Sequence, residues 1–213
     1  MFIKVINMKI GIIGGSDGLG KTLIYYFRDE FELSISARDH DKGRKVAEKL
    51  NVNYIESNKK LAAMSNILII SVPIHHTPSV IREVAPFMKK GSVMIDVTSV
   101  KEEPLKTMEE CLPDNVEFIP THPVFGPRTK ELDNQVIVLT ATKKGEWYKK
   151  VYDYLDELEF EREYLTYDFH DELEFEGEYL NGDRWNGKEY NVKGDFIAEY
   201  SKGKRKSKDC IIF

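Results

Sequence analysis

The chain has 213 residues, of which 41% are hydrophobic and 11% aromatic, and its formal net charge at pH 7 is −5. This composition suits a globular protein with a hydrophobic core and excludes a chain that is disordered throughout. No apolar run approaches the roughly 20 residues of a membrane-spanning helix, the first residues lack the features of a secretory signal, and Cys111 and Cys210 lack metal-like spacing. We therefore expect a cytoplasmic protein with no metal site.

The charge is unevenly distributed along the chain. The net charge is +2 over residues 1–155, −11 over 156–200 and +4 over 201–213. A break of this kind indicates a boundary, and we expect a large domain over 1–157, an acidic segment over 158–200 and a basic tail over 201–213. The basic tail is short and has no aromatic platform, so nucleic-acid binding is not expected.

Strand-like and helix-like stretches alternate over the first 155 residues. Apolar runs predict strands at 9–14, 32–37, 66–72, 93–97, 116–120 and 135–140. Helices are predicted at 19–29, 41–50, 77–88 and 145–158, and Thr77 is expected to cap the third of them, with Pro78 at its first position. This alternation predicts an α/β fold of the Rossmann type, with a doubly wound and mostly parallel sheet.

The pattern changes after about residue 158. Aromatic and polar residues alternate between glycine turns over 175–190, which is typical of a β-hairpin. The rhythm resembles a MORN-type repeat over about 173–200, although such repeats generally share a core among at least about three copies. A small hairpin segment and a partly ordered acidic tail both remain open.

The first strand runs directly into a glycine-rich turn, Gly-Gly-Ser-Asp-Gly-Leu-Gly at 14–20, and then into a helix. In this context glycines let the backbone approach a diphosphate, and the helix N-terminus offers N–H groups and a positive dipole end. Asp17 stands where the middle glycine of the usual motif belongs, so its charge must be turned away or used as a cap. We assign to a nicotinamide dinucleotide Gly14, Gly15, Ser16, Asp17, Gly18, Leu19 and Gly20, together with Ser71, Val72, Pro73 and Thr98 after later strands.

The end of the second strand bears on the choice of dinucleotide. Enzymes that select NAD usually place an acid there, whereas NADP enzymes accommodate the additional phosphate with an arginine. The sequence at 36–39 is Ser-Ala-Arg-Asp. Arg38 favours NADP, and Asp39 keeps NAD possible.

Polar residues follow three further strands, and ligands of open α/β sheets bind beyond such strand ends. His122 is the candidate acid–base group, because imidazole titrates near neutral pH and the flanking prolines stiffen its loop. Ser99 could hydrogen-bond the same substrate oxygen. Lys101 could contact the substrate, but we interpret it as a surface residue that opens the next helix, and Asp96 as a structural cap.

Four segments in this order and spacing, KIGIIGGSDGLGK, IISVPI, IDVTSVKE and PTHPVFGP, resemble the prephenate dehydrogenases of the arogenate/prephenate family. The resemblance covers residues 8–155 and most closely suggests the archaeal type. It implies oxidative decarboxylation of prephenate to 4-hydroxyphenylpyruvate in tyrosine synthesis, with a small-molecule substrate that is prephenate or arogenate. It also implies that His122 takes up the proton of the ring hydroxyl and that Ser99 helps to position that hydroxyl.

The chain departs from that family after residue 158. Members normally continue into a helical domain that forms the dimer and supplies an arginine for a substrate carboxylate. The acidic segment stands in its place here, and Arg128 is the nearby substitute that we nominate. An impaired dinucleotide-binding or scaffold protein is therefore the alternative, and the turn also resembles deazaflavin-dependent NADP reductases, against which the loop at 121–127 argues.

The last four residues, Cys210-Ile-Ile-Phe, follow a basic stretch. This arrangement fits a prenylation box at Cys210, which would bring the protein to membranes in a eukaryotic host. A basic terminus that happens to end in apolar residues is the other reading. The sequence leaves the oligomeric state open.

Overall fold

The computed structural model describes residues 8–129, 135–140, 145–157, 161–168, 172–180, 183–190, 196–201 and 204–207, and side chains as far as residue 155 apart from Thr140. The chain divides into two compact units, residues 1–132 and 133–213. This division lies before the limit at 157 that the charge pattern suggests, and the functional domain limits stay a prediction.

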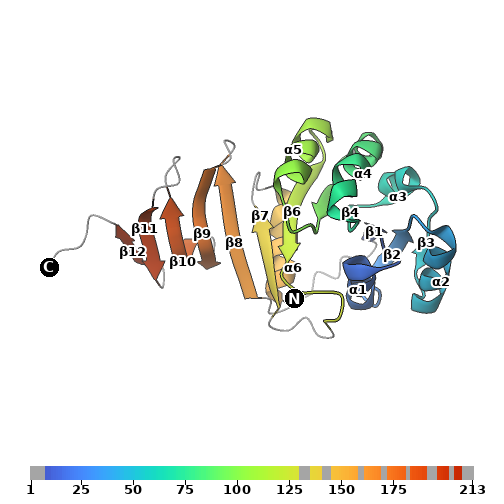
Figure 1. Cartoon of the computed structure of the whole chain (residues 1–213), viewed down its shortest axis with the longest axis horizontal. Helices are drawn as coiled ribbons and strands as arrows, with labels where there is room; N and C mark the ends of the chain where they lie inside the picture. Colours follow the sequence, from blue (N-terminus) through green and yellow to red (C-terminus); the bar gives the residue numbers. More distant parts are fainter. Residues whose placement is uncertain are drawn as a thin grey trace. The chain divides into compact units, whose positions relative to one another are not determined.

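The first unit is an open α/β sheet with six parallel strands (Figure 1). The strand order is β6-β5-β4-β1-β2-β3, in which β1 is Lys9–Ile13, β2 Glu32–Ser36, β3 Asn53–Tyr54, β4 Ile67–Ile70, β5 Val93–Asp96 and β6 Glu117–Pro123. Every described pair in this sheet is parallel. The expected doubly wound Rossmann fold is confirmed, and the order reverses between β1 and β4.

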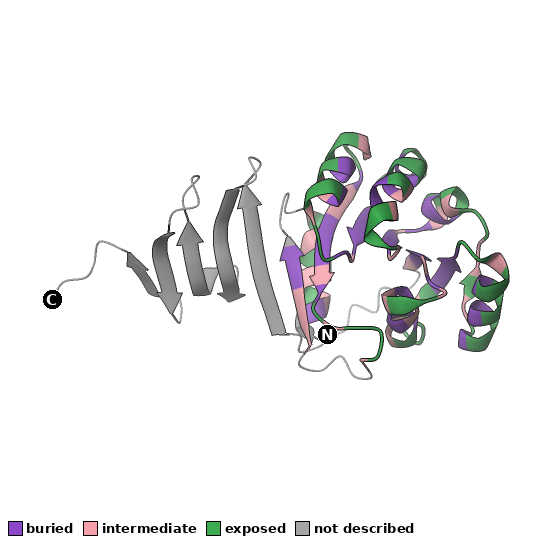
Figure 2. Ribbon diagram, in the orientation of Figure 1, coloured by how far each residue is buried: buried purple, intermediate pink, exposed green. Residues whose placement is uncertain are grey.

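Helices lie on both faces of this sheet, as right-handed crossovers from the reversal point require. One face carries α1 (Gly18–Phe27) and α2 (His40–Leu50), and the other carries α3 (Asn58–Met64), α4 (Thr77–Val84) and α5 (Glu102–Cys111) (Figure 1). Short 3-10 turns, η1 (Ile74–His76) and η2 (Ala85–Phe87), flank α4. Buried residues follow the strands and the inner faces of the helices (Figure 2).

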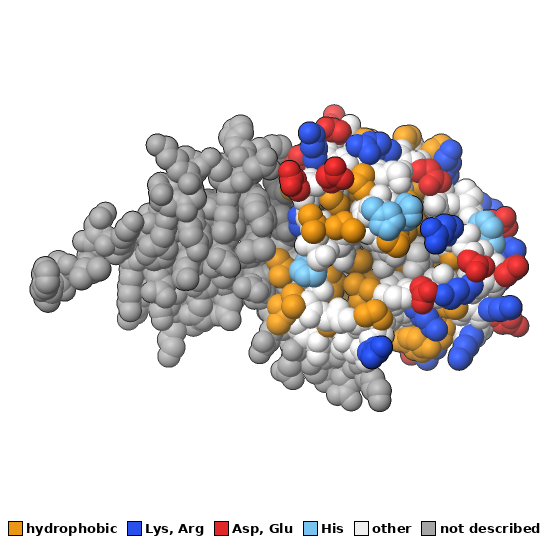
Figure 3. Space-filling model, in the orientation of Figure 1, with side chains coloured by type: hydrophobic (Ala, Val, Ile, Leu, Met, Phe, Trp, Pro, Cys, Tyr) orange, Lys and Arg blue, Asp and Glu red, His pale blue; other side chains and the backbone are white. Residues whose placement is uncertain are grey.

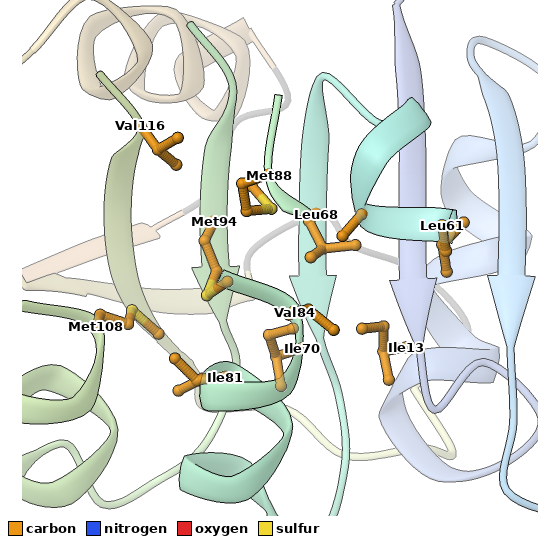
Figure 4. Packing of buried hydrophobic residues seen from close by; sticks show 11 residues of the cluster. Ile13, Leu61, Leu68, Ile70, Ile81, Val84, Met88, Met94, Met108 and Val116 are labelled. Atoms are coloured by element: carbon orange, nitrogen blue, oxygen red, sulfur yellow. The ribbon is translucent and has the colours of Figure 1, made fainter. Parts of the chain in front are cut away.

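A hydrophobic cluster fills the space between the sheet and α3, α4 and α5 (Figure 4). Its side chains come from both layers and include Ile13, Leu61, Leu68, Ile70, Ile81, Val84, Met94 and Met108. Gly11 lets α3 approach closely, since a Cβ there would collide with Ser65 and Leu61. The nearly continuous apolar sequences of β1 and β4 therefore reflect burial on both faces of a parallel sheet.

The structure corrects the expected start of one helix and adds two short elements. Thr77 is the first residue of α4 rather than its cap, and its buried hydroxyl has no hydrogen-bond partner among the described residues. The preceding 3-10 turn already forms the entry to the helix, with His76 N–H donating to the Pro73 carbonyl at 2.8 Å. The short elements β3 and α3 were not predicted, although Ser57 caps α3 by accepting a hydrogen bond from the Lys60 N–H.

The second unit begins with β7 (Val136–Thr140) and α6 (Glu146–Glu157), close to the predicted bounds. Five strands follow: β8 Glu161–Asp168, β9 Glu172–Leu180, β10 Asp183–Tyr190, β11 Phe196–Ser201 and β12 Lys204–Ser207. β7 pairs with β8 in parallel, and the later neighbours pair antiparallel. The predicted hairpin is thus present as β9 and β10, but Gly177 and Gly187 face each other inside the strands and not in turns.

Candidate functional site

The carboxyl ends of β1, β4, β5 and β6 meet at one edge of the sheet, because these strands are parallel neighbours. We call this the carboxyl edge. Three large hydrophobic side chains follow its strands and are exposed, Ile74 at 41%, Val100 at 53% and Val124 at 56%. On the face drawn in Figure 3, hydrophobic side chains lie beside histidines in the middle and charged ones mainly toward the rim. An apolar surface with a few polar groups is typical of a small-molecule site.

The glycine-rich turn after β1 has the geometry of a diphosphate-binding turn. Gly14 has a φ of 89°, and its N–H and that of Gly15 donate to the Ser36 carbonyl at 3.0 and 3.1 Å. A Cβ at Gly14 would collide with the Ser71 carbonyl, and one at Gly20 with the Gly14 carbonyl. A Cβ at Gly18 would meet no atom within contact distance. The turn therefore packs tightly against the Ser36 and Ser71 carbonyls and has free space at the start of α1, where a diphosphate would bind.

The negative charge of Asp17 beside this opening is paired with a lysine. It precedes α1, has no side-chain capping bond, and forms an ion pair with Lys42 of α2. The Lys42 ammonium, followed by the Gly18 N–H, holds the pKa of Asp17 below its usual value. The sequence left two alternatives for Asp17, a charge turned away from the ligand or a cap of α1. Its side chain does not cap α1, and its charge is compensated by Lys42.

The residues after β2 separate into two roles. Asp39 caps α2, because its carboxylate accepts a hydrogen bond from the Lys42 N–H at 3.0 Å. Arg38 is exposed immediately before it, after the buried end of the strand. The acid that could bind ribose hydroxyls is therefore committed to the helix, while the guanidinium faces solvent.

The segment after β4 lies against the glycine turn. The Ser71 N–H donates to the Ile13 carbonyl at 2.9 Å, and Ser71 and Val72 are half-buried whereas Pro73 is exposed. Their proposed contact with a dinucleotide stays a prediction, and it is compatible with this placement.

The structure corrects the interpretation of Lys101. Its side chain is only 13% exposed and binds the fully buried Asp96, with Nζ and Oδ2 2.7 Å apart. The same Asp96 oxygen accepts hydrogen bonds from the N–H and the hydroxyl of Thr98. Asp96 does act as a structural acceptor, as expected, but Lys101 is a buried partner and not a surface residue.

His122 lies in β6 beside this cluster. The Thr121 hydroxyl donates to the Asp96 carbonyl at 2.8 Å, which ties β6 to the end of β5. The Nδ1 atom of His122 is buried and has no hydrogen-bond partner among the described residues. Burial and then the Lys101 ammonium lower the pKa of His122, while Asp96 raises it. Ser99 is exposed on the loop after β5, whereas His122 lies inside β6 and not in a loop after it, so the predicted pair comes from adjacent strands.

Arg128 lies by α1 rather than in the described cluster around His122. The Thr22 hydroxyl donates to the Pro127 carbonyl at 3.0 Å, and the Tyr26 hydroxyl donates to the Thr129 carbonyl at 2.7 Å. These bonds frame a pocket of about 500 Å³. It is lined by Asp17, Gly18, Lys21, Thr22, Tyr25, Tyr26, Pro127, Arg128 and Thr129.

The adjacent histidines after β4 and the C-terminal cysteine add nothing to the description of this site. His75 and His76 stack with ring centroids 4.1 Å apart, and the described part of the chain holds no group of three or more residues suited to a metal ion. None of its helices is long and apolar enough to cross a bilayer. Cys210 lies outside the described residues, as does the rest of the proposed prenylation box.

The fold and the glycine turn define a Rossmann-type domain of the nucleotide-binding class. A sequence model described as the nucleotide-binding domain of prephenate dehydrogenase matches residues 26–161. The chain therefore belongs to the prephenate dehydrogenase family.

One curated relative agrees with this assignment, and two solved structures share the fold. A probable arogenate/prephenate dehydrogenase of Methanocaldococcus jannaschii is 43% identical over 157 residues, which are 72% of this chain and 35% of that protein. The crystal structure of Synechocystis arogenate dehydrogenase matches with a TM-score of 0.63 at 23% identity, over 75% of this chain and 60% of that one. Prephenate dehydrogenase of Aquifex aeolicus, in complex with hydroxyphenyl propionate and NAD+, matches with a TM-score of 0.63 at 15% identity, over 75% and 60%.

The chain spans about a third of the length of two curated relatives that it matches, 35% and 36%. The likeness to a MORN-type repeat over about 173–200 stays a prediction.

Proposed function

We propose that this chain oxidises prephenate or arogenate with a nicotinamide dinucleotide. The observation that carries the proposal is the placement of a diphosphate-type turn after β1 and a half-buried histidine in β6 at the same carboxyl edge. The nicotinamide, when bound, accepts the hydride. The family membership supplies the substrate class.

The protein's own groups would perform the remaining steps. Gly14, Gly15 and Gly20 let the backbone pack closely at this turn, and the first N–H groups of α1 hold the diphosphate. His122 accepts the hydroxyl proton of the substrate ring, and its exposed neighbour Ser99 hydrogen-bonds the same oxygen. Because Nδ1 is buried, Nε2 is the nitrogen that a ligand arriving from solvent would meet. Loss of the carboxylate then follows, driven by aromatisation of the ring.

Formation of reduced dinucleotide by the full chain tests this proposal. We expect absorbance of NADPH or NADH to rise when either substrate is added. A folded chain that binds a dinucleotide in calorimetry and yet reduces it with neither substrate would refute the dehydrogenase function and leave a dinucleotide-binding protein.

The exposed Arg38 favours NADP as the preferred dinucleotide. We expect Arg38→Ala to weaken NADPH binding about tenfold or more, since a charge-assisted hydrogen bond contributes about 1.5–3 kcal/mol, and to leave NADH binding nearly unchanged. Calorimetric titration of both dinucleotides measures the difference. Arg82→Ala, an exposed arginine on α4, is the matched control. Equal weakening of both dinucleotides would show that Arg38 does not contact the 2′-phosphate.

Lys21 and Arg128 both line the pocket beside α1 and would favour an anionic group there. If Arg128 binds a substrate carboxylate, Arg128→Met should raise the KM for prephenate about tenfold, the effect of losing one such bond, with the Kd for NADPH unchanged. Steady-state kinetics and dinucleotide titration on the same variant separate the two. A raised Kd for NADPH with an unchanged KM for prephenate would contradict the substrate assignment and show that the pocket binds the dinucleotide.

A further inference from the structure

Asp96 and Lys101 form a buried ion pair that the proposed chemistry does not yet use. The exposed fractions of the two side chains are 0% and 13%, and Lys101 Nζ also lies 3.4 Å from the Thr98 hydroxyl. A buried pair of this kind is costly to desolvate and seldom adds net stability. Its presence at a strand end therefore suggests a purpose other than holding the fold.

The pair lies at the end of β5, beside the part of β6 that carries His122. Asp96 is the partner of Pro120 in the β5–β6 ladder, and His122 follows two residues later on the same strand. Lys101 and Asp96 are also the charged groups that act on this imidazole within the described part of the chain, and they act in opposite directions. Screening is weak at buried positions, so charges there are felt strongly.

We propose that Lys101 is a positioning residue of the dehydrogenase reaction: its ammonium, fixed by Asp96 beside the strand that carries His122, supports this imidazole as the acceptor of the substrate proton. This inference rests on the proposed function of His122. Asp96 sets the strength of the effect, because it holds the ammonium in place and offsets part of its charge. Thr98, assigned above to the dinucleotide, also donates from its N–H and hydroxyl to the Asp96 oxygen that binds Lys101.

NMR titration of the His122 ring protons in the full chain tests the inference without any need for turnover. Lys101→Met removes the cation and leaves Asp96, so the midpoint of the His122 titration should rise by about one pH unit. Adding Asp96→Asn to that variant removes the remaining anion and should bring the midpoint back down. Lys101→Arg keeps the charge and should stay close to the unchanged chain. Lys106→Met, an exposed lysine on α5, is the matched control and should have no effect.

The same variants give a kinetic readout that a purely structural role would not change. In Lys101→Met the acid limb of kcat/KM should move to higher pH together with the NMR midpoint. A midpoint that does not move in Lys101→Met would overturn the inference, as would a raised KM with an unchanged pH profile, which would show direct substrate binding by Lys101. If Lys101→Met does not fold, two other variants still test the inference: Lys101→Met combined with Asp96→Asn, and Lys101→Arg. Equal midpoints of the His122 titration in these two variants would overturn it. A chain that shows the NMR shifts without any turnover would refute the proposed function while leaving the electrostatic role of Lys101 intact.

Discussion

His122→Asn is expected to lower the rate of NADPH formation from prephenate by about 100- to 10,000-fold, the usual contribution of a general base. The asparagine side chain cannot accept a proton near neutral pH, whereas the shape of the β6 end is largely kept. Dinucleotide affinity should be unchanged, because the glycine turn after β1 is not altered. Spectrophotometric turnover and calorimetric titration of NADPH, made on one preparation, measure both quantities.

His40→Asn provides the control, because His40 lies at the start of α2 and its ring is 2.6 Å from the Tyr54 hydroxyl, within a surface network. That variant should keep most of its activity. If His122→Asn remains as active as His40→Asn, the assignment of the base is wrong. A loss of dinucleotide binding in His122→Asn would instead point to a distorted site.

The pH dependence of turnover has a definite sign. His122 must be unprotonated to act as a base, so activity falls as the pH drops through its pKa. Because burial and Lys101 lower that pKa from 6.5, the acid limb of kcat/KM should lie below pH 6.5. A limb at or above that value would contradict the environment described for His122.

The sequence was sufficient to predict the parallel sheet apart from the short strand β3, whereas the assignment of the site stays a prediction. Apolar runs bounded by glycine or proline mark β1, β4 and β5, since strands buried on both faces carry few polar residues. Gly14, Gly15 and Gly20 lie where a Cβ would collide with neighbouring atoms, and a glycine-rich turn of this kind is visible in one sequence. The segment that contains His122 could be assigned to the same edge, because parallel strands end together.

The role of Lys101 could not be predicted in this way. Its position before α5 is the same whether the side chain points to solvent or toward Asp96, five residues earlier. Burial of the pair depends on how β5, β6 and α5 pack, which is a tertiary property. The capping of α2 by Asp39 is a local effect, by contrast, and the sequence Asp-His-Asp-Lys at 39–42 contains its signal.

Gly14→Ala is expected to produce the second large effect, a combined loss of stability and of dinucleotide binding. An alanine at a φ of 89° is strained by about 1–2 kcal/mol, and its Cβ would also collide with the Ser71 carbonyl, which adds about 1–3 kcal/mol. The strain and the displaced backbone move the turn away from the diphosphate. We expect the free energy of unfolding to fall by about 2–5 kcal/mol and dinucleotide affinity to drop about tenfold or more, the effect of one lost charge-assisted bond.

Gly91→Ala separates the two causes. Gly91 also has a positive φ, 73°, but a Cβ there meets no atom within contact distance and the residue precedes β5, away from the carboxyl edge. This variant should lose about 1–2 kcal/mol of stability from strain alone and should bind NADPH as the unchanged chain does. Chemical denaturation and calorimetry on both variants make the comparison. If Gly14→Ala bound NADPH as tightly as Gly91→Ala does, the backbone of this turn would not be the diphosphate site, because a ligand held by N–H groups cannot be indifferent to where those groups lie.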